Sequence, residues 1–117
     1  MEFSFTKADR LLKRNEFIQL SKVGRKLQND HFIAVYAPGR LDRCRLGVTV
    51  TKKVGRAVER NRIKRLIREY FRLNRHLILG KWDINVIAKK EAADLSSKEI
   101  FGSLQNIFER ISRRVEL

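Results

Sequence analysis

The sequence predicts an α+β fold in which three helices pack on a small sheet of about four strands. Three observations predict it. Some stretches alternate apolar and polar side chains, which is typical of strands, and others repeat apolar residues every three or four positions, which is typical of helices. These stretches follow one another in the order helix, strands, helix, strand, helix, without an internal repeat. The chain of 117 residues suits one domain, to which we assign residues 1–117.

The first part of the chain should form an arm, a helix and a short strand. Residues 1–12 carry large apolar side chains without helical or strand spacing, so we expect an ordered arm. The first helix should begin at Asn15, a residue type that caps helix N-termini. It should end at Gly24, a residue type common just after a helix. Residues 25–30 are expected to add a short strand.

Three further strands are predicted from alternation and β-forming residues. They are "HFIAVYA" (31–37), "RLGVTVT" (45–51) and "WDINVIA" (82–88), with a turn at residues 38–42 between the first two. In the first of these strands the two faces hold Phe32, Ala34 and Tyr36, and Ile33 and Val35, respectively.

Two long helices complete the fold. One should run over residues 57–73, and the other should close the chain within residues 95–114. Ser96 and Glu99 have the spacing of a capping box at the start of the last helix. Its apolar seam consists of Ile100, Leu104, Ile107 and Ile111.

The net charge of the chain indicates which class of molecule it binds. The chain carries 27 Lys and Arg against 13 Asp and Glu, a net charge of +14, yet 43% of its residues are hydrophobic. A folded body with such an excess is typical of proteins that bind a polyanion. No apolar stretch approaches the roughly 20 residues of a membrane span, and no signal peptide precedes the first charges, so we expect a cytoplasmic protein. Cys44 is the only cysteine, which excludes a disulfide framework and a zinc cluster of cysteines.

The predicted helix 57–73 separates apolar from basic side chains. At about 100° per residue, one arc holds Ile63, Leu66, Ile67, Tyr70 and Leu73, which should pack on the sheet. A second arc holds Arg60, Asn61, Lys64, Arg65, Arg68 and Arg72, and Arg62 lies apart near Glu69 and Leu73. Residues 52–75 contain ten cationic and two anionic side chains, a net +8 of the total +14. Solvated helix faces usually alternate the two signs, so this pattern predicts a surface for phosphates.

No residue pattern predicts catalysis or metal binding by the protein itself. Asp30 with His31, Asp83 and His76 form no convergent set of carboxylates or imidazoles, so we interpret them as incidental to function. Cys44 lies between two arginines that would lower its thiol pKa, but it has no partner for redox or nucleophilic chemistry.

Residues 49–72, "TVTKKVGRAVERNRIKRLIREYFR", closely resemble the signature of the bacterial ribonuclease P protein subunit. The resemblance extends weakly over the whole chain, with "LLKRNEF" (11–17) similar to the first helix of the family and "WDINVIAKK" (82–90) similar to its last strand. The thirteen matching positions are Lys52, Lys53, Val54, Gly55, Ala57, Val58, Arg60, Asn61, Arg62, Lys64, Arg65, Arg68 and Glu69.

The resemblance implies a function that composition alone does not supply. Family members bind the catalytic RNA of ribonuclease P, and the complex removes the 5′ leader from precursor tRNA. Hydrolysis is expected to use Mg²⁺ held by the RNA, with no catalytic side chain and no cofactor or metal bound by the protein alone. The family also implies a left-handed crossover through the basic helix. The residues expected at the catalytic RNA are Lys52, Lys53, Arg56, Arg60, Asn61, Arg62, Lys64, Arg65, Arg68 and Arg72.

The resemblance also implies a cleft for the single-stranded leader, formed by the first helix and the exposed sheet face. The residues expected there are Phe17, Ser21, Ile33 and Val35. Phe17 matches a family aromatic that can stack on a base. The sequence departs from the pattern at Ser21 and Val35, where many or some members carry aromatics, and Tyr36 should face the core instead. The alternative for Phe17 is a core phenylalanine under the N-terminal arm.

The residues alone leave two other functions to consider. A ribosomal-type structural RNA-binding protein could carry the same basic helix without a part in cleavage, although the Lys-Lys-Val-Gly run joined to Arg-Asn-Arg disfavours it. A DNA-binding helix-turn-helix would place its basic helix after another helix, whereas here it follows a strand.

Overall fold

A computed structural model describes residues 9–39, 43–78 and 80–113 of the chain and confirms the predicted α+β class. Residues 1–8 and 40–42, which include most of the expected arm and part of the expected turn, lie outside the described residues. The helices and strands are α1 (Arg14–Val23), β1 (Arg25–Gln28), β2 (Phe32–Pro38), β3 (Arg45–Thr49), α2 (Ala57–Asn74), β4 (Trp82–Ala88) and α3 (Ser97–Ser112), with short 3₁₀ turns η2 (Arg75–Leu77) and η3 (Lys90–Ala92).

The sheet has the strand order β1-β2-β4-β3. β1 pairs with β2 and β2 with β4 in antiparallel fashion, whereas β3 pairs with β4 in parallel. Parallel neighbours cannot be joined by a tight turn, so the chain must cross over the sheet between them. α2 makes this crossing, and its left-handed sense stays a prediction from the family resemblance.

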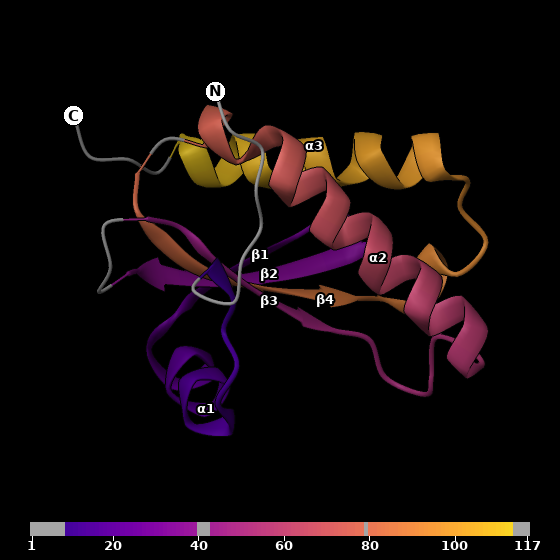
Figure 1. The fold of residues 1–117 in the computed structure, drawn as a ribbon, viewed down its shortest axis with the longest axis horizontal. Coiled ribbons are helices and arrows are strands. Elements are labelled where there is room, and N and C mark those ends of the chain that lie inside the picture. Colours follow the sequence, from indigo (N-terminus) through magenta and orange to yellow (C-terminus); the bar gives the residue numbers. More distant parts are fainter. Residues whose placement is uncertain (1–8, 40–42, 79, 114–117) are drawn as a thin grey trace.

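The helices cover the two faces of the sheet unequally. α2 and α3 lie on one face and α1 lies on the other (Figure 1). Phe32, Ala34 and Tyr36 face α2 and α3 in the main core, whereas Val35 belongs to a second apolar cluster with Leu20 of α1. The alternation predicted for β2 is therefore confirmed. No helix in the described part of the chain is long and apolar enough to cross a lipid bilayer.

The buried side of α2 differs in part from the predicted arc. Ile63, Ile67 and Tyr70 are buried as expected, but Leu66 and Leu73 are only half-buried. Phe71 was not on the predicted arc and is fully buried. The reason is that α3 packs against α2, so the Phe71 ring meets that of Phe108 at a centroid distance of 6.0 Å.

The start of α1 also differs from the sequence prediction. The N-cap is Lys13 rather than Asn15. The side chain of Glu16 determines this start, because its Oε1 accepts hydrogen bonds from the backbone N–H groups of Leu12 and Lys13, both at 3.1 Å. A carboxylate in this position satisfies N–H groups that the helix leaves unpaired. The end at Gly24 is confirmed, since its N–H donates to the carbonyl of Leu20 at 2.7 Å.

The capping box predicted for α3 is confirmed. The backbone N–H of Ser96 donates to Glu99 Oε1 at 2.9 Å, and the N–H of Glu99 donates to Ser96 Oγ at 3.1 Å. The predicted seam of isoleucines and leucine on this helix is buried. Local sequence therefore fixes both the start of α3 and the side it turns to the core.

Arg45 joins α1 to the sheet. Its guanidinium donates to Glu16 Oε2 at 2.6 Å and to both carboxylate oxygens of Asp83 at 3.0 and 2.9 Å. Burial alone would raise the pKa of Glu16, but hydrogen bonds from the Lys13 N–H, from Arg45 and from the Leu12 N–H outweigh burial and lower it. Asp83, interpreted from the sequence as incidental, is thus half of a structural ion pair.

The lowered pKa of Glu16 predicts a pH-dependent contribution to stability. A carboxylate whose pKa is depressed by folding stabilises the native state above its unfolded pKa, and this contribution is lost as the pH falls through the folded pKa. Glu16→Gln should therefore lower the free energy of unfolding by about 1–2 kcal/mol at pH 7 and by much less near pH 3. Urea unfolding at both pH values measures this difference. The matched control is Glu91→Gln, which replaces an exposed glutamate of η3; an equal loss for Glu16→Gln at both pH values would contradict the assignment.

Candidate nucleic-acid interface

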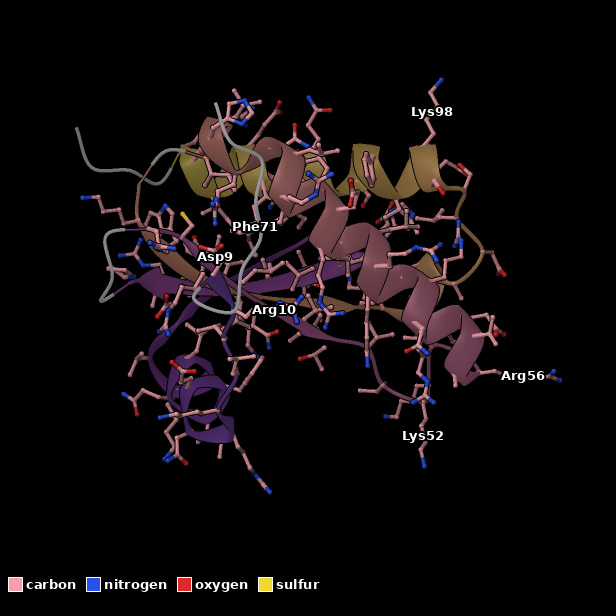
Figure 2. The ribbon with its side chains drawn as sticks, in the orientation of Figure 1. Asp9, Arg10, Lys52, Arg56, Phe71 and Lys98 are labelled. Carbon is pink, nitrogen blue, oxygen red and sulfur yellow. The ribbon has the colours of Figure 1, made fainter. Side chains whose placement is uncertain are left out.

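The cations predicted to bind nucleic acid line the outer side of α2 and the turn before it. Lys52, Lys53, Arg56, Asn61 and Arg65 are exposed. Lys52 and Arg56 project into solvent from the N-terminal end of α2 (Figure 2). Arg60, Lys64 and Arg68 are half-buried and follow one another along one flank of the helix. We call the set Lys52, Lys53, Arg56, Arg60, Asn61, Lys64, Arg65 and Arg68 the basic face.

The local sequence explains how the basic face is presented. Val54 is buried, and its N–H donates to the carbonyl of Thr51 at 3.0 Å, so the turn before α2 is anchored to the core. The lysines that precede Val54 are thereby held outward at the start of the helix. Partial positive charge at a helix N-terminus adds to theirs. The potential at this end of α2 consequently favours a phosphate.

Two of the predicted residues are engaged within the protein. Arg62 donates from Nη2 to the carbonyl of Leu95, in the segment just before α3, at 2.9 Å, which agrees with its outlying place on the wheel. Arg72 forms an ion pair with Glu69, one turn away on the same helix. The hydrogen bond from Arg72 lowers the pKa of Glu69. Arg62 and Arg72 are therefore not part of the basic face.

Sequence reasoning missed Arg10, which joins the basic face from the N-terminal arm. Arg10 forms an isolated parallel bridge with Leu46 at the edge of β3. Burial, and after it the charge of Arg10, lower the pKa of Arg68. Residues 10 and 68 are far apart in the chain, so no spacing in the sequence could have indicated that their charges interact.

The other face of the sheet carries the residues predicted for a single strand. Phe17 lies over the backbone of β3, where a Cβ atom on Gly47 would come within 2.5 Å of its ring. The ring is partly buried beside Leu11, so both readings of Phe17 apply in part: it packs on the sheet and remains accessible. Ser21 is exposed, and its hydroxyl donates to the carbonyl of Ile18 at 2.7 Å.

The strand residues of this face form two neighbouring register rows; in the first, Val35 and Gly47 are buried and Asn85 is half-exposed. Val35, Asn85 and Gly47 are register partners beneath α1, and Val35 is only 3% exposed. Its side chain is therefore closed off by α1, contrary to its predicted place in the cleft. The next row consists of Ile33, Ile87 and Thr49, which are all half-exposed.

Asn85, Ile87 and Thr49 were not singled out from the sequence. Thr49 Oγ1 donates to Asn85 Oδ1 at 3.1 Å, so a hydroxyl and an amide stand beside the apolar pair Ile33 and Ile87. The signal was present, because alternation along β3 and β4 places these residues away from the main core. We call Phe17, Ile33, Thr49, Asn85 and Ile87 the open sheet strip.

Two of the remaining candidates, Cys44 and His31, have structural roles. Burial raises the pKa of Cys44, which corrects the lowered value expected from its two arginine neighbours. The thiol lies 3.3 Å from the carbonyl of Gly80 and is buried. His31 Nδ1 lies 2.9 Å from Ser103 Oγ and joins the β1–β2 turn to α3. Among the residues that the structure describes, no three His, Cys, Asp or Glu side chains gather as metal ligands.

Comparison with known proteins agrees with this geometry. A family model described as ribonuclease P matches residues 5–112. The ribonuclease P protein component of Desulfatibacillum aliphaticivorans is 54% identical over 110 residues, which cover 94% of this chain and 93% of the relative.

Solved structures give the same result. The RNase P protein of Staphylococcus aureus superposes with a TM-score of 0.83 at 36% identity, covering 89% of this chain and 95% of that one. The RNase P protein of Thermotoga maritima gives a TM-score of 0.81 at 35% identity, covering 87% and 96%. With a family model over most of its length, a relative at this identity and the same fold, the chain belongs to the ribonuclease P protein family and is a ribonuclease P protein subunit.

Proposed function

We propose that this subunit anchors on the catalytic RNA of ribonuclease P through the basic face and holds the 5′ leader of precursor tRNA on the open sheet strip. It would act in the cytoplasm as part of a ribonucleoprotein endonuclease. The observation that carries the proposal is the placement of these two surfaces on opposite sides of β3. The cations of α2 lie on one side and a half-exposed apolar and amide strip lies on the other. One small body can then contact two nucleic acids at once.

The basic face is suited to the RNA backbone. Arginine guanidinium groups bind phosphate oxygens in bidentate fashion, and each phosphate that is neutralised releases counterions from the RNA. Asn61, exposed among the cations, can donate to a phosphate or a 2′-hydroxyl and can accept from a base edge. The RNA would thus bind by charge and shape, with little dependence on sequence.

Arg65 offers a direct test of this surface. Arg65→Ala should weaken binding of the catalytic RNA and reduce the slope of log K against log[salt] by about 0.7–0.9, the value of one phosphate contact. Filter binding or fluorescence anisotropy over a salt series measures the slope. The matched control is Arg25→Ala, which removes an exposed arginine from β1 at the other edge of the sheet. If both variants have the wild-type slope, the basic face is misassigned.

The open sheet strip is suited to a single strand. A base can stack on the partly exposed ring of Phe17, and base–aromatic stacking is typical of single-strand sites. Thr49 and Asn85 add polar groups that can bind a sugar or a base edge. Because Val35 is covered and Ser21 lacks a ring, stacking in this cleft would depend mainly on Phe17.

Phe17→Ala should therefore weaken binding of precursor tRNA without affecting binding of mature tRNA. Loss of one stacked base costs about 1–3 kcal/mol, or roughly five- to 150-fold in affinity for the leader-bearing substrate. Affinities of the holoenzyme for precursor and mature tRNA provide the measurement. As the control, Leu20→Ala removes a buried α1 side chain from the same cluster and should lower stability instead. Equal losses for both tRNAs with Phe17→Ala would mean that the ring serves only packing.

The chemical step is assigned by the family resemblance to Mg²⁺ held by the RNA. Four of the described carboxylates, those of Asp9, Glu16, Glu69 and Asp83, are engaged in ion pairs with arginines. The residues of the protein would bind and orient the two RNAs and screen their mutual repulsion. This screening should lower the concentration of Mg²⁺ that cleavage requires.

The decisive experiment is cleavage of a leader-bearing precursor tRNA by the catalytic RNA at low Mg²⁺, with and without this chain. Restored cutting at the mature 5′ end is the expected result. The Arg65→Ala holoenzyme should need more Mg²⁺ or more protein to reach the same rate. If the chain binds the RNA and leaves cleavage unchanged, the role is that of a structural RNA-binding protein, as in the ribosome.

A further inference from the structure

The N-terminal arm presents one arginine to the α2 side of the sheet. The N–H of Leu11 donates to the carbonyl of Leu46 at 2.9 Å, and the side chain of Leu11 is buried in the cluster beneath α1. Successive side chains of an extended segment point to opposite sides. Arg10 therefore points away from α1, toward the side of β3 against which α2 packs, and Figure 2 shows it beside the ribbon there.

Arg10 and Arg68 form a pair of like charges. Arg68 is half-buried, and besides burial the charge of Arg10 lowers its pKa. Because Arg10 lies at the edge of β3 on the side where α2 packs, the two guanidinium groups repel each other in the protein alone. A phosphate between them would replace that repulsion with two attractive contacts, and guanidinium groups are well shaped for this.

Asp9 explains why the arm lies where it does. Its side chain is 1% exposed, and its Oδ1 lies 2.9 Å from Arg43 Nη1 and 2.6 Å from Arg75 Nη1. Arg43 precedes β3, and Arg75 follows α2 directly, where it also lies over the ring of Phe71. A buried carboxylate is tolerated only with such partners. Asp9 thus connects the arm to the segment that precedes β3 and to the end of α2.

We propose that Arg10 and Arg68 together bind one phosphate group of the ribonuclease P RNA, and that Asp9 is a positioning residue that holds Arg10 at this site. The proposal extends the basic face from α2 across the edge of β3 to the arm. It rests on the proposed function, since it takes the catalytic RNA as the partner of the basic face.

A double-mutant cycle on RNA binding tests the shared phosphate. Arg10→Ala and Arg68→Ala should each weaken binding of the catalytic RNA by about three- to tenfold near 0.15 M salt. If they share one phosphate, the double variant should lose about as much as one single variant and about 0.7–0.9 of salt slope in total. Two separate phosphates would give multiplied losses and twice that change in slope, which would overturn the shared site. Arg25→Ala is the control for removing one charge.

A positioning role for Asp9 and a simple count of charges predict opposite effects on RNA binding. Asp9→Ala or Asp9→Asn makes the protein more basic, so electrostatics alone would tighten RNA binding. A positioning role predicts weaker binding instead, up to the loss seen with Arg10→Ala, and no further loss when Arg10 is already alanine. Circular dichroism checks whether each variant is folded. If the Ala variant is not, RNA binding is measured with the Asn variant, which keeps the shape of the side chain. Tighter binding by a folded variant would overturn the role of Asp9.

The outcomes separate this inference from the function on which it rests. If the wild-type chain shows no salt-dependent binding to the catalytic RNA, the proposed function fails. If the wild-type chain binds, and Arg65→Ala weakens it while Arg10→Ala behaves like Arg25→Ala, the function stands and the phosphate site at Arg10 is wrong. A loss with Arg10→Ala that Arg10→Lys largely restores supports a cation at this position.

Discussion

The parallel pairing of β3 with β4 is the constraint on which the rest of this structure depends. Parallel neighbours require a long connection across the face of the sheet, and here that connection is the basic helix. The buried row of α2, with Ile63 and Ile67, attaches it to the sheet and so fixes its rotation about its own axis. The charged flank has to face outward as a consequence. The parallel pairing of β3 with β4 therefore places the cations of α2 on the outer surface of the protein.

Segregation of charge on α2 costs the isolated protein some stability. Like charges one turn apart destabilise a helix by a few tenths of a kcal/mol each. Several acidic residues of the described chain, which could have relieved this repulsion, pair with other arginines instead. Glu16 and Asp83 hold Arg45 between α1 and the sheet, and Asp9 holds the arm. The basic face is left uncompensated, and an RNA backbone can provide the missing negative charge.

The edge strand β3 lies at the boundary between the two proposed surfaces. Its Gly47 lets the ring of Phe17 rest on the backbone, because any larger residue would place a Cβ atom inside that contact. On its outer edge it pairs with Arg10 of the arm. The catalytic RNA and the leader would thus meet the protein on the two opposite sides of one strand. This proximity suits a subunit that has to bring a substrate strand close to an RNA active site.

The sequence by itself determined the element types, the face that β2 turns to the core, and the sorting of cations on α2, since these follow from periodicity within single segments. It also indicated the family through thirteen positions at fixed spacing. Tertiary structure alone decided that α1 closes off Val35, that α3 buries Phe71, that Arg62 bonds to Leu95 just before α3, and that Arg10 lies beside Leu46 of β3. Each of these depends on contacts between segments distant in the chain, and local periodicity carries no information about which distant segment will cover a given side chain.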